Sequence, residues 1–330
     1  MSATHPVVMI GVDAAELELV RRLAADGTLP TLARLLDTGS AGALAGDASL
    51  FAGGVWPTFY TGRDVAWHGL YHNKLWRQER MRCEIAEAEW FPDPPFWERL
   101  DTGFRLAVLD VPMTVATPKA VNGISLAGWG THDVIARGAW PASLWGDLVR
   151  AHGEPAMPAE LFGAQSPRTL ERLAADLTAA TEQMGQIGAE LLGRERWDLF
   201  LLVFGAAHRG GHYLWDLSHV DAGALPPDRR RRLEAALAGV YGAVDQALGR
   251  VLARAPSDAR VLVFAVHGMG PNTAWADRCA DILSRIQSGG AGAPPKRGLL
   301  YAIKRRLPWP LVRAVTTRLP ASVQAKLVTL

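Results

Sequence analysis

The sequence predicts an α/β protein in which helices cover both faces of a mostly parallel sheet. Amphipathic helical patterns alternate with apolar runs, and each run has the length of a strand that is buried on both faces. The four runs are VVMIGV at 7–12, FRLAVLDVP at 104–112, DLFLLVFG at 198–205 and ARVLVFAVHG at 259–268. This alternation is typical of layered α/β domains.

The first strand and the helix after it are clear from residue spacing. The run at 7–12 is continuous and rich in branched residues, and Asp13 ends it. Apolar residues then recur at helical spacing until Gly27, a residue type that commonly ends helices. The pattern therefore predicts a strand that leads directly into a helix.

Two long helices are expected between the later strands. The first begins at Ser166 and Pro167, a capping residue followed by proline in the first turn, and extends to about Leu192. The second begins at Pro227 and carries apolar residues on one face as far as Val251. Each helix is long enough to lie along one face of the sheet.

We expect a domain, a linker and a terminal segment. Residues 1–287 form the α/β domain, with an insertion at about 72–95, where Trp, Arg and Glu are frequent and no periodicity is clear. Residues 288–297 (SGGAGAPPKR) form the linker, because Gly and Pro are concentrated there. Residues 298–330 form a basic, amphipathic segment that prolines interrupt.

The charge of the chain is unevenly distributed, although its formal net charge is only +2. Nine Lys and Arg residues and no acidic residue follow Asp281, so 33 acidic residues face 26 basic ones up to that point. Short helices that cover part of the core are the ordinary interpretation of the basic segment. Contact with a membrane surface or an acidic protein partner is the alternative.

Composition excludes several classes of protein. With 49% hydrophobic and 21% charged residues in 330, the chain is not intrinsically disordered. Cys83 and Cys279 fit neither a disulfide framework nor a thiolate metal site, which favours a reducing compartment. No signal peptide or membrane span is recognisable, so we expect a cytoplasmic protein. The scattered tryptophans indicate packing and no nucleic-acid partner.

Polar side chains follow the predicted strands at one edge of the sheet, where open α/β sheets bind their ligands. These residues are Asp13, His208, His212 and His267. Carboxylate and imidazole groups are ligands of zinc and manganese, and histidines four residues apart share a helical face. The alternatives are a helix cap at Asp13 and hydrogen-bonded structural histidines.

A glycine turn that opens a short helix is the second candidate feature. In GGVWPTFYTG at 53–62, Gly53 and Gly54 allow close backbone approach, and Pro57 suits the first turn of the helix. The free N–H groups of such a turn would face an anion such as phosphate. His68 follows shortly after, where a structural role in the loop is the alternative to contact with substrate.

Four longer segments contain these motifs. They are VVMIGVDAAELELVRRLAADGTLPTLARLLDTGSAGAL at 7–44, VWPTFYTGRDVAWHGLYH at 55–72, HRGGHYLW at 208–215 and VLVFAVHGMGPN at 261–272. Their order and spacing across about residues 5–275 resemble the alkaline phosphatase superfamily, in the branch of type I phosphodiesterases and nucleotide pyrophosphatases. The resemblance implies an alkaline phosphatase-like three-layer sandwich. It also implies a two-metal hydrolase of phosphate or sulfate esters, in which Ser or Thr attacks the phosphorus.

Only part of the family's site carries over to this sequence. Asp13 matches the first metal-ligand Asp, His212 matches a ligand of the other metal, and His267 matches the His of the Asp-His-Gly motif. The nucleophile's place, nine residues before Thr61, falls on Ala52, which has no oxygen for the attack.

Two carboxylate ligands of the family are also replaced. The family has Asp at two positions that are Val266 and His208 in this sequence. No His follows His267, where the family supplies another ligand, so either the chain is shorter than a complete catalytic domain or that ligand is dispensed with. Because anionic ligands attract divalent ions, these losses imply one zinc or manganese ion instead of two. Its ligands would come from the set Asp13, His208, His212 and His267.

The departures change the chemistry that the resemblance implies. Thr58 and Ser49 are the nearest hydroxyls to Ala52 in sequence, but attack by metal-bound hydroxide or a substrate hydroxyl is favoured, with His208 or His267 as general base. Asn272 could hydrogen-bond a phosphate oxygen, although a role in a turn is the alternative. The residues expected near substrate are Ala52, Gly53, Gly54, His68 and Asn272.

We therefore expect a metal-dependent hydrolase or group-transfer enzyme that acts on a phosphate or related ester of a small molecule, without the usual Ser or Thr nucleophile. The alternative is a catalytically inactive homologue that serves as a binding or assembly protein, which Ala52, Val266 and the absent late His favour. Three imidazoles at one edge of the sheet favour the enzyme.

Overall fold

The chain divides into two compact units, residues 1–272 and residues 273–330. The computed structural model describes residues 5–46, 48–87, 90, 93–115, 122–131, 134–158, 161, 165–218, 220, 225–271, 273 and 279–287. In the second unit these include the helix α11 (Cys279–Gln287). The predicted linker at 288–297 and basic segment at 298–330 lie outside the described residues. Within the described part, no helix is both long enough and apolar enough to cross a lipid bilayer.

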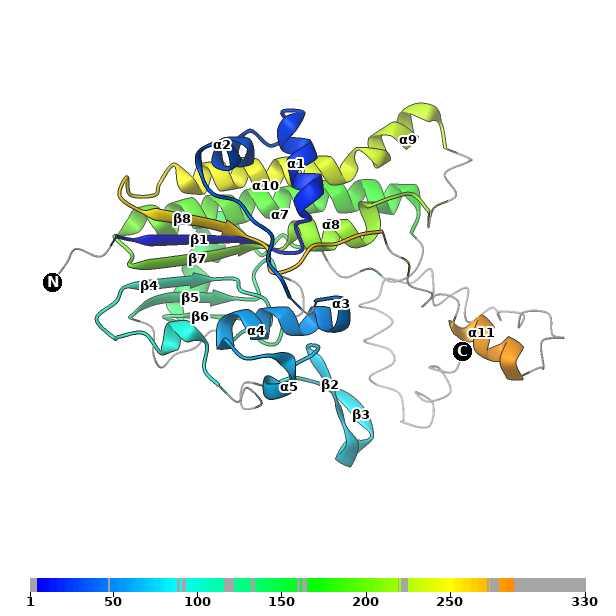
Figure 1. Ribbon diagram of the computed structural model, residues 1–330, viewed down its shortest axis with the longest axis horizontal. Coiled ribbons are helices and arrows are strands. Elements are labelled where there is room, and N and C mark those ends of the chain that lie inside the picture. The colour runs from blue at the N-terminus through cyan, green and yellow to red at the C-terminus, as the bar shows by residue number, and fades with distance from the viewer. Residues whose placement is uncertain are drawn as a thin grey trace. The chain divides into compact units, whose positions relative to one another are not determined.

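A six-stranded sheet of order β6-β5-β4-β7-β1-β8 forms the centre of the first unit (Figure 1). Its strands are β1 (Val7–Val12), β4 (Leu106–Leu109), β5 (Gly123–Ala127), β6 (Gly138–Trp140), β7 (Leu199–Phe204) and β8 (Arg260–Phe264). All neighbours pair in parallel except β5 and β6. The predicted mostly parallel sheet is confirmed. The apolar pattern does not predict β5 and β6, which are only five and three residues long.

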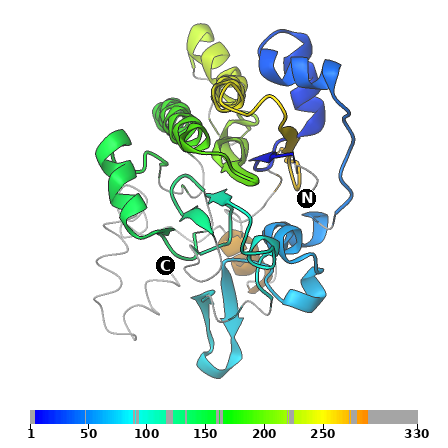
Figure 2. The same ribbon diagram turned by 90° about the vertical axis from the view of Figure 1, so that its left-hand side faces the viewer.

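Helices cover both faces of this sheet, as the end-on view shows (Figure 2). The helices of the first unit are α1 (Leu17–Ala25), α2 (Pro30–Thr38), α3 (Ala48–Phe51), α4 (Val55–Thr61), α5 (Val65–His68), α6 (Ser143–His152), α7 (Pro167–Arg194), α8 (Ala206–Leu214), α9 (Pro227–Glu234) and α10 (Ala236–Leu252). The larger core lies between one face and α1, α2, α6, α7, α8 and α10. A smaller core joins the other face to α4 and a turn at Phe96–Glu98. The result is the expected three-layer sandwich.

The central strand β7 shows how the sequence builds these two cores. Phe200 and Phe204 pack into the larger core, whereas Leu201 and Val203 pack into the smaller one. Side chains alternate between the faces of a strand, so a continuous apolar run supplies both cores. The strand is buried along its whole length, as the sequence predicts.

The two long helices agree with the sequence at their starts. Ser166 caps α7, because its hydroxyl accepts a hydrogen bond from the backbone N–H of Thr169. The helix predicted from Pro227 to Val251 is interrupted, however: α9 ends at Glu234 and α10 begins at Ala236. The apolar face continues across this break, which explains why the spacing suggests one helix.

Strand β8 departs from the expectation that the strands are buried on both faces. Val261 is 42% exposed and Leu262 is 48% exposed. Within the described residues β8 is the last strand of the sheet, so only β1 pairs with it. The sequence does not reveal this position, because an edge strand and a central strand can have equally apolar sequences.

The segment predicted as an insertion contains an antiparallel hairpin of β2 (Lys74–Arg77) and β3 (Arg82–Ile85). Arg80 and Arg82 both pair with Glu84.

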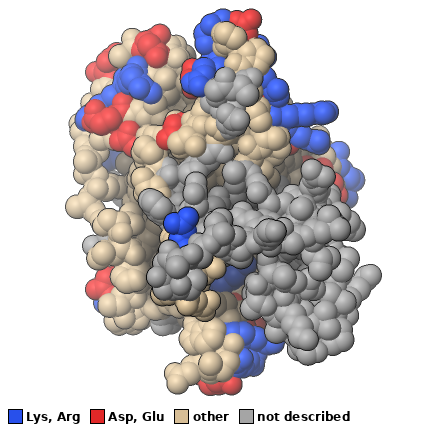
Figure 3. All heavy atoms as spheres, turned by 90° about the vertical axis from the view of Figure 1, so that its right-hand side faces the viewer, with Lys and Arg blue, Asp and Glu red and all other residues tan. Residues whose placement is uncertain are grey.

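Figure 3 views the side towards which the carboxyl ends of the strands point, with the hairpin at the bottom. There, and at the upper margin of this view, described side chains of both charge signs lie together.

A buried carboxylate from α10 caps helix α2, and its removal should destabilise the protein. Asp245 is fully buried and accepts hydrogen bonds from the backbone N–H groups of Thr31 and Leu32, at 2.9 and 2.7 Å. We expect Asp245→Ala to lower the free energy of unfolding by about 2 kcal/mol, measured by urea denaturation. The control Asp26→Ala removes an exposed carboxylate from the Thr28 N–H and should have little effect. Equal effects of the two substitutions would contradict this role of Asp245.

Candidate metal and catalytic site

Asp13 forms the base of the candidate site, directly after β1. Its backbone N–H donates to the carbonyl of Phe204 at 2.9 Å, which continues the pairing of β1 with β7 past the end of both strands. The side chain is fully buried. The indole N–H of Trp56, on α4, donates to Asp13 Oδ1 at 2.7 Å. Strand pairing and this hydrogen bond from α4 fix the carboxylate at the edge of the sheet.

Helix α8, directly after β7, carries the two histidines that the sequence places on one helical face. His208 Nδ1 lies 3.0 Å from Asp13 Oδ2, and His208 Nε2 lies 3.0 Å from His212 Nε2. His208 is buried, whereas His212 is exposed. Asp13, His208 and His212 therefore form a continuous series of polar groups from the buried edge of the sheet to the surface.

His267, just beyond β8, completes the cluster. Its Nδ1 lies 2.8 Å from the carbonyl oxygen of Gly268, and because a carbonyl can only accept, Nδ1 is the donor. A neutral ring then presents the lone pair of Nε2, which lies 3.5 Å from Asp13 Oδ1. Two acceptor atoms thus face each other, an arrangement that a cation or a proton between them would stabilise.

The geometry of the cluster suits a divalent metal ion. Asp13, His208 and His267 each offer a ligand atom, and these atoms all lie within 4.8 Å of one another. Ligand atoms about 2 Å from one tetrahedral ion lie roughly 3.3 Å apart, close to the 3.0 and 3.5 Å that separate the two imidazoles from the carboxylate. One carboxylate and two imidazoles are donors that zinc accepts. His212 lies outside this group of three, next to His208.

Thr58 and His68 form a separate pair. The backbone N–H of Leu70 donates to His68 Nδ1 at 3.0 Å, so the proton of the neutral ring is on Nε2. Nε2 lies 3.0 Å from Thr58 Oγ1 and donates to it. Burial lowers the pKa of the His68 imidazole and keeps the ring neutral. His68 in this state cannot take a proton from Thr58.

The glycine turn contacts the protein's own backbone. Ala52, Gly53 and Gly54 form a tight turn that leads into α4. A Cβ on Gly53 would lie 2.4 Å from the carbonyl oxygen of Tyr71, so glycine is required for this contact. Whether the turn also meets a substrate stays a prediction. Asn272, the other expected substrate contact, lies outside the described residues.

Asp110 is a buried residue near the site that the sequence analysis missed. It follows β4 directly, as Asp13 follows β1, so the same positional rule could have found it. Its carboxylate is fully buried and accepts hydrogen bonds from the backbone N–H groups of Trp129 and Gly130, at 2.7 and 2.6 Å. Burial raises the pKa of Asp110 to about 6, although backbone N–H groups oppose this shift.

The loop that Asp110 holds packs against the start of α8. Gly205 is the residue before this helix, and a Cβ there would lie 2.8 Å from the carbonyl oxygen of Gly130. The contact between these two backbones fixes the N-terminus of α8. Asp110 thereby supports the helix that carries His208 and His212 without touching either ring.

Comparison with known proteins gives a family match and a structural match. The family model of type I phosphodiesterase / nucleotide pyrophosphatase matches residues 7–318. Among solved structures, phosphonoacetate hydrolase from Sinorhizobium meliloti 1021 in complex with phosphonoformate is similar, with 19% identity and a TM-score of 0.53 over 83% of this chain and 58% of that chain. Its complex with phosphonoacetate gives 18% identity and a TM-score of 0.51 over 87% and 63%. No curated protein sequence matches significantly.

These matches differ in what they establish. The structural likeness, at such low identity, concerns the fold alone. The chain also spans only about three fifths of the length of these solved structures. The chemistry must therefore be argued from the residues of the site.

Proposed function

Because the chain belongs to the type I phosphodiesterase / nucleotide pyrophosphatase family of the alkaline phosphatase superfamily, we propose that it hydrolyses or transfers a phosphate, or related, ester of a small molecule. The observation that carries this proposal is the cluster of Asp13, His208 and His267, whose ligand atoms lie within 4.8 Å of one another. These residues would hold one divalent ion, zinc or manganese. When bound, such an ion neutralises charge on the phosphoryl group and assists the attack.

The protein's own residues supply proton transfer and orientation. His208 is held between Asp13 and His212, so its ring cannot rotate freely. His212 is exposed and can exchange protons with solvent. We assign to His212 the role of general base, which takes the proton of the attacking hydroxyl and releases it to solvent, because His208 would give the lone pair of Nδ1 to the ion and carry its proton on Nε2.

The attacking group comes from water or from a second substrate. Ala52 has no oxygen, and the Thr58 hydroxyl accepts a hydrogen bond from His68, which cannot act as its base. The reaction would therefore proceed by direct displacement, without a covalent bond between the phosphoryl group and the protein. Activity by this route does not require a hydroxyl at position 52.

The proposal can be tested on the purified protein with a pair of variants. We expect the parent protein to bind one equivalent of zinc or manganese and to hydrolyse p-nitrophenyl phosphate or bis(p-nitrophenyl) phosphate, with loss of activity on chelation. Ala52→Thr should change the rate less than tenfold, because no step uses that side chain. The control Ala48→Thr places the same side chain on the neighbouring helix α3.

Other outcomes would favour the second candidate function, a catalytically inactive binding protein, which the missing oxygen at Ala52 supports. A parent protein without activity in either metal would contradict the proposal. If Ala52→Thr then gained activity and Ala48→Thr did not, the site would be one that has lost only its nucleophile.

A further inference from the structure

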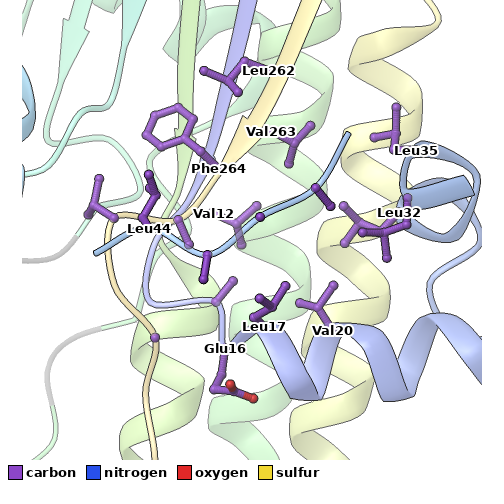
Figure 4. A pocket seen from close by; sticks show the side chains of 18 of the residues that line it. Val12, Glu16, Leu17, Val20, Leu32, Leu35, Leu44, Leu262, Val263 and Phe264 are labelled. Atoms are coloured by element: carbon purple, nitrogen blue, oxygen red, sulfur yellow. The ribbon is translucent and has the colours of Figure 1, made fainter. Parts of the chain in front are cut away.

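An open apolar groove of about 620 Å³ lies between β8 and the helices α1 and α2 (Figure 4). The extended segment 39–44 crosses it. Side chains of Val12, Val20 and Val263 surround the same space, and Leu32 lies at the α2 side. The volume falls within the roughly 300–1,000 Å³ that small-molecule pockets occupy. We call this feature the β8 groove.

The groove exposes apolar side chains to water. Val261, on the face of β8 that carries Val263, is 42% exposed, and Leu44 on the crossing segment is 67% exposed. The floor is formed by buried apolar residues, including Val244 of α10. Contiguous exposed apolar surface of this kind marks binding sites, because covering it releases water.

Two of the polar side chains that line the groove, Glu16 and Tyr241, serve the protein itself. The carboxylate of Glu16 caps α1 by accepting hydrogen bonds from the backbone N–H groups of Glu18 and Leu19. The hydroxyl of Tyr241 accepts a hydrogen bond from the N–H of Glu16 at 3.2 Å. Most of the remaining described lining is aliphatic or aromatic. The groove is therefore suited to a hydrocarbon ligand rather than to a sugar or a nucleobase.

The groove adjoins the metal and catalytic site through His267. His267 lines it, and the same ring lies 3.5 Å from Asp13. Val12, which also lines it, directly precedes Asp13. A ligand with an anionic head at the histidine cluster can therefore place an apolar chain along β8.

We propose that the β8 groove binds the hydrocarbon chain of the substrate, so that the substrate is a phosphate ester of a long-chain alcohol or lipid. The assignment of the head group rests on the proposed function. An extended peptide added to the edge of β8 that is unpaired among the described strands would meet the segment 39–44, which crosses the same groove. An unbranched alkyl chain has no side groups to clash with that segment.

The probe for this proposal is a series of n-alkyl phosphates, from butyl through octyl to dodecyl. Their dissociation constants would be measured by calorimetry with the zinc-loaded and the metal-free protein, below the concentration at which dodecyl phosphate self-associates. Full burial of a methylene strengthens binding about fourfold, so for this open groove we expect dodecyl phosphate to bind at least about 30-fold more tightly than octyl phosphate. Dodecanol, which lacks the head group, should also bind.

A matched pair of variants assigns the effect to the groove. Val261→Glu places a charge in the groove at a half-exposed position on the face of β8 that carries Val263, and should weaken dodecyl phosphate binding at least about tenfold while leaving the affinity for inorganic phosphate unchanged. The control Ile85→Glu alters a similarly exposed strand residue on the hairpin. It should change the dissociation constant of neither dodecyl phosphate nor inorganic phosphate.

The outcomes separate this proposal from the proposed function. Affinity that is independent of chain length, or unaffected by Val261→Glu, overturns the groove assignment even if short esters are hydrolysed. Affinity that depends on chain length and on Val261, in a protein that hydrolyses no ester, supports the hydrocarbon site and overturns the enzymatic proposal alone.

Discussion

Replacing Asp110 with alanine is expected to lower the free energy of unfolding by about 4 kcal/mol near pH 4.5. The substitution removes the acceptor of two short hydrogen bonds from the N–H groups of Trp129 and Gly130. Trp129 and Gly130 are both buried, so their N–H groups would lose a partner without gaining water. Because Gly130 packs against Gly205, the start of α8 should loosen too, and hydrogen exchange of that helix should accelerate.

The effect of Asp110 should depend on pH with a definite sign. Burial raises the pKa of this carboxyl to about 6, above its value of about 3.9 in an unfolded chain. The folded state therefore binds the proton more tightly, and the stabilisation that this gives below pH 4 is lost as the pH rises through 6. The difference in stability between the parent and Asp110→Ala should shrink by on the order of 3 kcal/mol between pH 4 and pH 7.

Urea denaturation of both proteins across that range measures the difference. Asp101→Ala is the matched control, since Asp101 is an exposed carboxylate that also accepts a backbone N–H, from Gly103. Its effect should be small. A difference for Asp110 that grew with pH would mean that the N–H groups outweigh burial and that the ionised form is favoured in the folded state.

Much of the fold follows from the sequence because it depends on local patterns. The apolar runs of β1, β4 and β7 are continuous since these strands lie inside a layered sheet, and such runs are visible without any knowledge of partners. The exposure of Leu262 is not visible in this way. It depends on which strand lies at the edge, and strand order is a property of the whole chain.

Parts of the candidate site can likewise be predicted from local patterns, and other parts cannot. Asp13 and His267 can be placed together from the sequence because parallel strands bring their carboxyl ends to one edge. The bond from Trp56 to Asp13 joins helix α4 to the end of strand β1, and no spacing in the sequence indicates it. Asp110 was overlooked for a different reason: its position after β4 fits the rule, but only its burial distinguishes it from a turn residue.

Replacing Asp13 with asparagine is expected to weaken zinc binding at least about 100-fold and to abolish metal-dependent ester hydrolysis. The carboxylate is the only anionic member of the three-residue ligand group described in the structure. Asparagine retains a carbonyl oxygen that can accept the indole N–H of Trp56, so the fold should persist while the charge is lost. Zinc affinity would be measured by competition with a chromophoric chelator, and thermal denaturation would confirm folding.

Two further variants make this result specific to the ligand group. His212→Ala removes a ring that lies beside His208 but outside the group of three, so it should weaken zinc binding about tenfold at most. His152→Ala, on α6, removes a histidine that pairs with Glu190 and should leave zinc affinity unchanged. If Asp13→Asn bound zinc as well as the parent, the facing acceptors of Asp13 and His267 would be bridged by a proton, and the site would have to work without a metal.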